Sequence, residues 1–171
     1  MTAQQLHIAN GLYLAMLVAV AIATRATARR IAGAIAGAAA GGAMALGADA
    51  IGEGFGWWRM AIWGPDILPL VYLNLVVSCT PIFLVTWRVA RRFGRLGLTV
   101  GTVVLAVIGP PRDYAYMARF PEWGAYAPGV EPVLAIAAIY ATLVPLGHSV
   151  MRLVAGPASH DRLARRPWET A

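Results

Sequence analysis

Residues 31–48 read IAGAIAGAAAGGAMALGA, an uninterrupted stretch of alanine, glycine and a few larger apolar residues. Gly33, Gly37 and Gly41 recur at every fourth position, and Ala45 continues the series. Small residues at this spacing form one face of a helix and allow a second helix to approach closely within a membrane. The stretch therefore predicts a membrane-spanning helix whose small face serves contacts within the chain or self-association of two chains.

The whole chain has the composition of a membrane protein. Of its 171 residues, 59% are hydrophobic and 13% are charged, and the mean hydropathy is +0.63, whereas soluble domains carry about 25% charged residues. This composition excludes a soluble enzyme, a disordered chain and a module that binds nucleic acid. The single cysteine, Cys79, excludes a disulfide framework and a cysteine-rich metal site. The three histidines are expected in separate parts of the molecule, so we predict no metal and no cofactor.

Five apolar segments approach the roughly 20 residues that a spanning helix needs. They cover residues 6–24, 31–48, 67–87, 96–111 and 132–155. The fourth is short and reaches its length only by including the Pro110–Pro111 pair, where we expect the helix to end. The sequence thus predicts an all-α polytopic bundle, a single integral-membrane domain over residues 1–171 with a tail at 156–171.

The charged residues indicate how this bundle is oriented. All 14 basic residues are arginine, and eleven of them follow or end the first, third and fifth predicted helices: Arg25, Arg29, Arg30, Arg88, Arg91, Arg92, Arg95, Arg152, Arg162, Arg165 and Arg166. The opposite loops hold six of the eight acids: Asp49, Glu53, Asp66, Asp113, Glu122 and Glu131. Because an excess of arginine marks the cytoplasmic side, we expect a multi-pass protein of the cell membrane with its N-terminus outside and its C-terminus in the cytoplasm.

The first outer loop, residues 49–66, holds the strongest candidates for chemistry. Asp49 and Glu53 are four residues apart and share a helix face if the preceding helix extends this far. Steps of four drift by about 40° around a helix, so Asp49 is expected near the glycine face and toward the bundle. Desolvation in such a place favours a protonated acid. We therefore predict Asp49 and Glu53 as catalytic acids, although acids in an outer loop are also compatible with simple solvation.

Trp57 and Trp58 follow these acids and are predicted to bind substrate. A protonated acid beside aromatic rings can protonate an alkene or an epoxide, and the ring faces stabilise the cation that forms. The same tryptophans also fit an interfacial aromatic belt, so both interpretations stay open.

The second outer loop, residues 110–132, is long and rich in tyrosine, tryptophan and proline. Loops of this length in compact domains are usually functional, and we expect this one to form a wall or a lid over a pocket. It contributes Asp113 as a third catalytic candidate and Arg112, Tyr114 and Glu131 as substrate-binding candidates. Glu131 also suits the start of the following helix, where a carboxylate interacts favourably with the helix dipole.

Two polar residues are expected inside the membrane. Asn74 lies in the third predicted helix and His148 in the fifth. Polar groups within a membrane are functional candidates by default, so both are predicted to contact substrate. A histidine that merely bridges two helices is the alternative for His148.

The run 53–59, EGFGWWR, is followed by Leu68, Pro69 and Leu70. This succession of an acid, a Phe-Gly pair, aromatic residues and proline resembles integral-membrane carotenoid hydratases, and it is similar to small membrane terpene cyclases. The segment 128–132, PGVEP, is similar to a region of membrane spiroketal cyclases of the avermectin type. The resemblance implies acid-initiated cyclisation or hydration of a lipid-like substrate.

Residues and resemblance together predict an acid/base enzyme that acts on an isoprenoid or polyketide substrate in the membrane. The alternative is a small non-catalytic membrane protein, a transport component or an assembly component of a complex. The two hypotheses differ in one structural respect, because only the enzyme needs the outer acids to converge on a pocket.

The predicted orientation can be tested by cysteine accessibility. A cysteine introduced at position 27 is expected to react with an impermeant thiol reagent only from the cytoplasmic side, and one at position 124 only from outside. The reason is the unequal distribution of arginine. Labelling of position 27 from outside would contradict the orientation.

Overall fold

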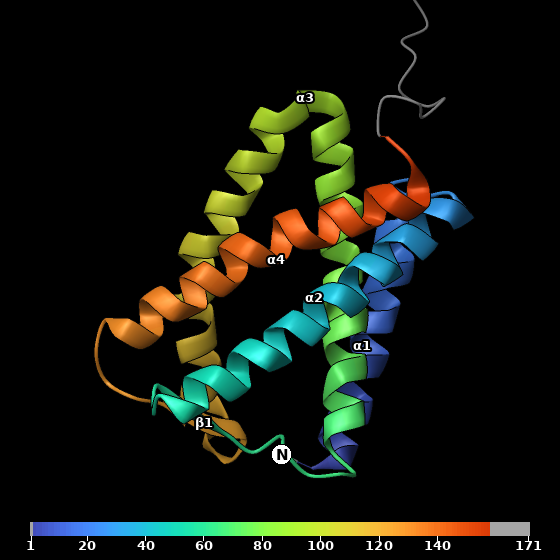
Figure 1. The fold of residues 1–171 in the computed structure, drawn as a ribbon. Helices are drawn as coiled ribbons and strands as arrows, with labels where there is room; N and C mark the ends of the chain where they lie inside the picture. The colour runs from blue at the N-terminus through green and yellow to red at the C-terminus, as the bar shows by residue number, and fades with distance from the viewer. Residues whose placement is uncertain (1, 158–171) are drawn as a thin grey trace, which may run out of the picture.

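The computed structural model describes residues 2–157 and consists mainly of α-helices (Figure 1). The helices are α1 (Ala3–Ala23), α2 (Ala28–Gly54), α3 (Leu68–Arg119) and α4 (Glu131–Ala155). All four are long and apolar enough to cross a membrane. The predicted all-α membrane bundle is confirmed, while the predicted tail lies outside the described residues from position 158 onward.

Helix α3 combines two of the five predicted helices, so the structure has four helices where the sequence predicted five. Its 52 residues are interrupted at Gly94, whose φ of 63° and ψ of −147° are not helical. Glycine adopts positive φ without the steric cost that a side chain would add. The chain reverses here (Figure 1), and the segments predicted at 67–87 and 96–111 become a first arm (68–93) and a second arm (95–119).

Two helices run further than predicted. The extension of α2 shortens the first predicted outer loop, and the extension of α3 shortens the second. Helix α2 continues to Gly54 instead of ending at residue 48, and α3 continues through Pro110 and Pro111 to Arg119. Proline lacks an N–H and normally breaks a helix, which is why the sequence suggested an end at this pair. Membrane helices tolerate proline where neighbouring helices and local adjustments satisfy the freed backbone groups. Asp49 and Asp113 therefore belong to helices rather than to loops.

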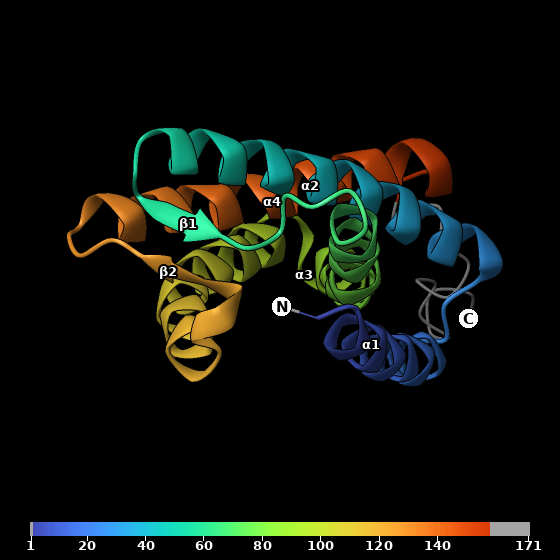
Figure 2. The same ribbon diagram turned by 90° about the horizontal axis from the view of Figure 1, so that it is seen from below.

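Helices α2 and α4 lie side by side as one layer (Figure 2) and pack through the predicted glycine face. A Cβ atom added at Gly37 would overlap the carbonyl oxygen of Gly147, and one added at Gly33 would lie 3.0 Å from the carbonyl oxygen of Met151. The Nε atom of Arg29 donates a hydrogen bond of 2.9 Å to the carbonyl of Val154. Of the two uses predicted for the glycine face, the structure thus shows the contact within the chain.

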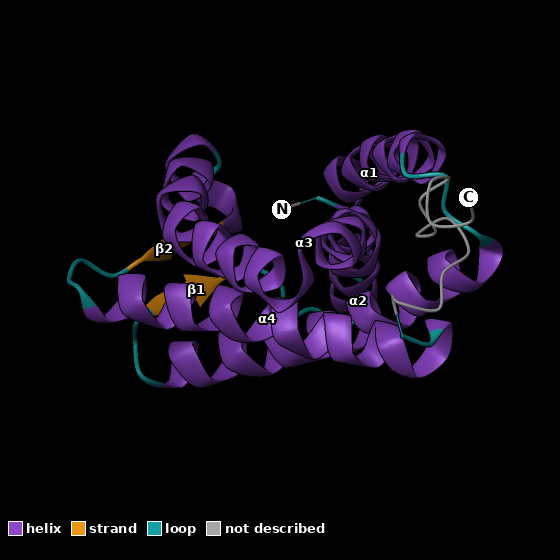
Figure 3. Cartoon of the chain, turned by 90° about the horizontal axis from the view of Figure 1, so that it is seen from above, coloured by secondary structure: helices purple, strands orange, loops and turns teal. Residues whose placement is uncertain are grey.

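Helix α1 packs on the other side of the bundle, against the first arm of α3 (Figures 2 and 3). The amide nitrogen of Asn74 donates a hydrogen bond of 2.8 Å to the side-chain oxygen of Asn10, and Arg88 donates one of 3.2 Å to the carbonyl of Thr24. The amide of Asn74 therefore serves as a contact between two helices.

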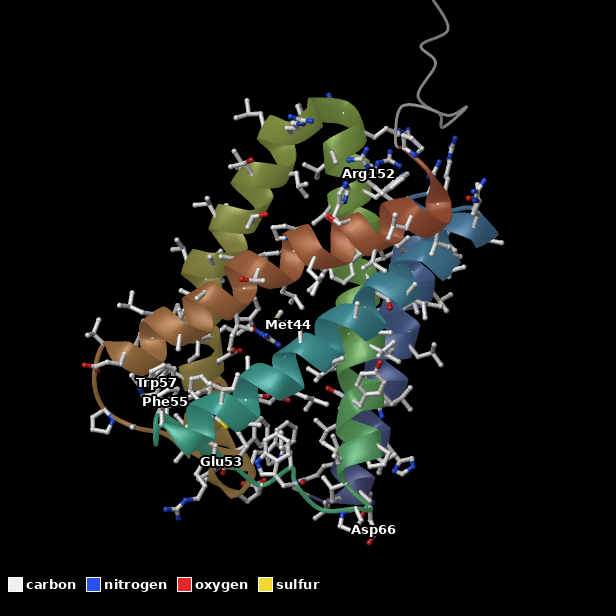
Figure 4. The ribbon with its side chains drawn as sticks, viewed as in Figure 1. Met44, Glu53, Phe55, Trp57, Asp66 and Arg152 are labelled. Atoms are coloured by element: carbon white, nitrogen blue, oxygen red, sulfur yellow. The ribbon has the colours of Figure 1, made fainter. Side chains whose placement is uncertain are left out.

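The two ends of the bundle differ in charge. Figure 4 shows Arg152 at one end and Glu53 and Asp66 at the other, and we call these the arginine-rich end and the acidic end. The acidic end also holds β1 (Trp58–Met60), the short 3₁₀ helix η1 (Pro121–Trp123) and β2 (Gly124–Tyr126). The strands pair antiparallel, with Trp58 opposite Tyr126 and Met60 opposite Gly124.

The contact between α2 and α4 predicts a large effect of bulk at position 37. Gly37→Ile is expected to destabilise the protein by about 1–3 kcal/mol or more, because overpacking at a backbone contact cannot be relieved locally. The midpoint of thermal unfolding in detergent measures this effect. Gly47→Ile is the matched control, since a Cβ atom at Gly47 in the same helix meets nothing within 4 Å. Equal stability of the Gly37 variant and the wild type would contradict the proposed packing.

Candidate functional site

A cavity of about 520 Å³ lies between all four helices and the two short strands, toward the acidic end. Helix α1 contributes Tyr13 and Met16 to its lining, and α2 contributes Gly42, Ala45 and Asp49. Both arms of α3, one residue of η1, the short strands and α4 complete the wall. The deep part of the lining is apolar, and the charged groups gather at the end nearest the strands.

Two of the three predicted catalytic acids line this cavity, and they come from different helices. Asp49 lies near the end of α2, and Asp113 lies in the second arm of α3. Among the charged side chains that act on Asp49, Asp113 has the largest effect, ahead of Glu53. The carboxyl group of Asp49 accepts no hydrogen bond from the described residues, so its oxygens are available toward the cavity.

Asp113 is held by two donors. The hydroxyl group of Tyr140 in α4 lies 3.1 Å from each carboxylate oxygen of Asp113. A guanidinium nitrogen of Arg112 lies 3.3 Å from one of these oxygens and donates a hydrogen bond of 3.0 Å to the Tyr140 oxygen. Gly109 makes this arrangement possible, because a Cβ atom there would overlap the Tyr140 ring. The two donors offset part of the cost of burying the Asp113 carboxylate and fix its orientation.

An aromatic wall closes the cavity toward the acidic end. The indole nitrogen of Trp58 donates a hydrogen bond of 2.9 Å to the backbone carbonyl of Asp49, and the Trp58 ring meets the Tyr126 ring edge-on, with centroids 5.9 Å apart. Gly52 leaves room for the Trp58 ring, which a Cβ atom at that position would overlap. The wall therefore places the Trp58 ring next to Asp49.

Of the ten predicted site residues, the cavity brings five together: Asp49, Trp58, Asn74, Arg112 and Asp113. Glu53 does not line it. Its carboxylate accepts hydrogen bonds from the backbone nitrogen of Met60, at 3.2 Å, and from the indole of Trp63. These bonds hold the end of β1 and the segment that follows it against the end of α2.

Trp57 and Tyr114 also lie outside the cavity lining. The Trp57 ring stacks on the exposed ring of Phe55, with centroids 4.8 Å apart (Figure 4). The Tyr114 ring stacks on Tyr126 at 4.6 Å, and its hydroxyl donates to the carbonyl of Ala127. Tyr114 supports the aromatic wall, and Trp57 is half-buried between the core and the exposed Phe55 ring.

Glu131 and His148 occupy the two ends of α4. Glu131 is exposed in the first turn of the helix, where its charge complements the helix dipole. His148 is buried near the other end, and its ring lies 5.7 Å from the ring of Trp87. Neither residue lines the cavity.

Tyr126 and Tyr140 line the cavity but are not among the ten predicted site residues. In the sequence, Tyr126 offers a hydroxyl group in the aromatic loop, and Tyr140 recurs with His148 and Arg152 at multiples of four residues, but neither pattern marks an acid/base site. Burial raises the pKa of the Tyr126 phenol above its usual range, and the nearby charges of Asp113 and Asp49 raise it further. The phenol of Tyr126 is therefore a neutral group at physiological pH and lies close to both acids.

Among residues 2–157, no group of three or more His, Cys, Asp and Glu side chains is arranged to hold a metal ion. Comparisons with family models, with curated proteins and with solved structures gave no match.

The raised pKa of Tyr126 predicts a loss of stability in base. Above about pH 10 an ordinary tyrosine ionises, so the unfolded chain releases a proton that the folded protein retains, and the free energy of unfolding falls as the pH rises. Tyr126→Phe is expected to show a smaller fall between neutral and strongly basic pH. Thermal unfolding in detergent across this range measures the difference, and identical slopes for variant and wild type would contradict the assignment.

Proposed function

We propose that this protein is an acid/base enzyme of the cell membrane that catalyses proton-initiated cyclisation or hydration of a hydrophobic isoprenoid or polyketide substrate. The observation that carries the proposal is the cavity, in which carboxyl groups of two helices meet an aromatic wall and an otherwise largely apolar lining. A non-catalytic component would not need acids from α2 and α3 on one cavity.

Asp49 is the proton donor in this proposal. Its surroundings combine apolar side chains with the negative charges of Asp113 and Glu53, and both factors favour a carboxyl group that carries its proton. The proton passes from the Asp49 carboxyl to an alkene carbon or an epoxide oxygen of the substrate, which leaves an aspartate and a carbocation.

Asp113 is the proton acceptor. Arg112 and Tyr140 donate hydrogen bonds to its carboxylate, whereas the Asp49 carboxyl group accepts none from residues 2–157. In a cyclisation, an internal double bond attacks the cation, and Asp113 removes the proton from a neighbouring carbon. In a hydration, water adds to the cation and Asp113 takes the proton that this water loses. Two carboxyl groups with different environments thus take the acid and base roles.

Trp58 stabilises the cation between these steps. The negative face of an indole ring attracts a positive charge within about 6 Å, and Trp58 lines the cavity from a position fixed by its bond to the Asp49 carbonyl. The buried rings also keep bulk water away from the cation, which would otherwise be captured prematurely.

Asp113 replaces Glu53 as the partner of Asp49 in this mechanism. The helical spacing favoured the pair of Asp49 and Glu53, but the hydrogen bonds of Glu53 to Met60 and Trp63 occupy its carboxylate outside the cavity lining. Glu53 supports the site by holding the strand segment that carries Trp58.

The proposal predicts that both acids are required for turnover. Membranes of a bacterial host that expresses the protein are incubated in D₂O with squalene, its epoxide or lycopene, and products are identified by mass spectrometry. A product formed by protonation of an alkene carbon is expected to carry one deuterium at that carbon, whereas a product formed from the epoxide receives its deuteron on oxygen, in a hydroxyl group that exchanges with solvent. Asp49→Asn and Asp113→Asn are expected to lower turnover by about 100-fold or more, the usual contribution of a general acid or base.

Asp66→Asn is the matched control, because Asp66 is an exposed acid at the same end that does not line the cavity. It is expected to retain turnover. If Asp49→Asn and Asp113→Asn both kept full activity while eluting as folded protein, the acid/base mechanism would be wrong.

A further inference from the structure

The cavity is extended. On the first arm of α3 its lining extends from Val71 to Ile82, and on the second arm from Leu105 to Met117, which at 1.5 Å per residue corresponds to about 16–18 Å. A volume of about 520 Å³ over this length accommodates one hydrocarbon chain rather than the two chains of a phospholipid.

The cavity is blocked toward the aqueous side of the acidic end. A second hollow, of about 680 Å³, lies there and is lined by charged residues such as Glu53, Arg59 and Glu122. Trp58, Met60 and Tyr126 line both hollows and form the wall between them. Trp58 is only 4% exposed, so this wall closes the polar route into the cavity.

The cavity reaches the surface of the bundle on its lateral side. Met16 of α1 and Ile108 of the second arm both line it, yet they are 40% and 55% exposed. Figures 2 and 3 show α1 and the second arm apart from each other, on the side of the bundle away from α2. Residues that face both the cavity and the surface form its rim. Met16 and Ile108 are apolar members that belong to spanning helices, and Arg112, whose side chain is 56% exposed, is a charged member toward the acidic end. We call the opening between Met16 and Ile108 the lateral portal, and its apolar rim faces hydrocarbon.

We propose that the substrate is a single-chain, uncharged lipid that enters sideways from the bilayer through the lateral portal. Its reactive end lies beside Asp49 and Asp113, and its chain extends along the apolar depth toward Ile82 and Leu105. The statement about the reactive end rests on the proposed function. The route and the single chain rest on the shape of the cavity and on its rim.

Cys79 provides a reporter for this route, because it is the only cysteine of the chain, is buried and lines the cavity. Purified protein in vesicles of phosphatidylcholine and phosphatidylglycerol is treated with pyrene maleimide, which partitions into the bilayer. A disulfonated stilbene maleimide, which stays in water, is applied in parallel to both sides of the membrane. Only the pyrene reagent is expected to label Cys79 in the folded protein, whereas both label it in SDS.

Substitutions at the rim test the portal itself. Ile108→Trp is expected to slow labelling of Cys79 by about tenfold or more, and Ile108→Ala is expected to accelerate it. Val107 is the matched control, because it is adjacent, is 66% exposed and does not line the cavity. Val107→Trp should label like the wild type. Met16→Trp, with Leu12→Trp as its control, tests the opposite rim if the Ile108 variants do not fold.

The chain specificity is tested by competition. Phytol, a single branched chain with one hydroxyl group, is expected to slow labelling of Cys79 when mixed into the vesicles, whereas cholesterol at the same mole fraction is not. Equal protection by both would overturn the single-chain assignment.

Three outcomes would overturn the lateral route. They are labelling of Cys79 by the sulfonated reagent, no labelling by either reagent, and a labelling rate that neither Ile108→Trp nor Met16→Trp changes. None of these measurements depends on turnover, and they can be repeated on Asp49→Asn protein. If the route is confirmed but both acids prove dispensable, the proposed reaction fails while the portal stands. If both acids are required but the portal proves closed, the proposed reaction stands while the lateral route fails.

Discussion

The backbone contact between α2 and α4 is the constraint on which the rest of the structure depends. At Gly37 and Gly147 the two helices touch without intervening side chains, so their distance and their rotation about the contact are strongly restricted. Leu143 of α4 packs on Gly41 and also lines the cavity, where it lies near Gly42 and Ala45 of α2. On α2 the cavity is lined by the small residues Gly42 and Ala45 and, one turn further, by Asp49. One helix pair thus supplies both the stability of the bundle and two walls of the candidate site.

The polar groups of the site are concentrated where they can be satisfied. Arg112 and Tyr140 compensate the charge of Asp113, and Trp58 is anchored on a backbone carbonyl of α2. In a low-dielectric interior an uncompensated charge is costly, and hydrogen bonds to it are correspondingly strong. The rest of the lining is largely apolar, which excludes water from a cationic intermediate and accommodates a hydrocarbon chain. The same distribution of polarity therefore serves the proposed chemistry and the proposed route of entry.

The differences between the predicted and the observed helices have local causes. Gly94 connects two segments that hydropathy separates correctly, but its positive φ gives a tight reversal instead of a loop. Pro110 and Pro111 suggested a helix end, and the packing of the second arm against α4 keeps the helix intact past them. The extension of α2 to Gly54 follows the same logic, because Gly52 near its end leaves room for the Trp58 ring. In α2 and in the second arm of α3, helix packing outweighs a local signal for a break.

The sequence by itself determined the membrane class, the glycine face and the direction of Asp49 toward the bundle. These properties follow from apolar segment length and from the periodicity of a single helix, which are local. It also singled out Asp113 and Arg112, but only as members of a loop. The tertiary structure alone decided that Asp113, and not Glu53, shares a cavity with Asp49, and that Tyr140 bonds to it from another helix. Such pairings depend on the register and angle at which separate helices meet, and the periodicity within one helix carries no information about either.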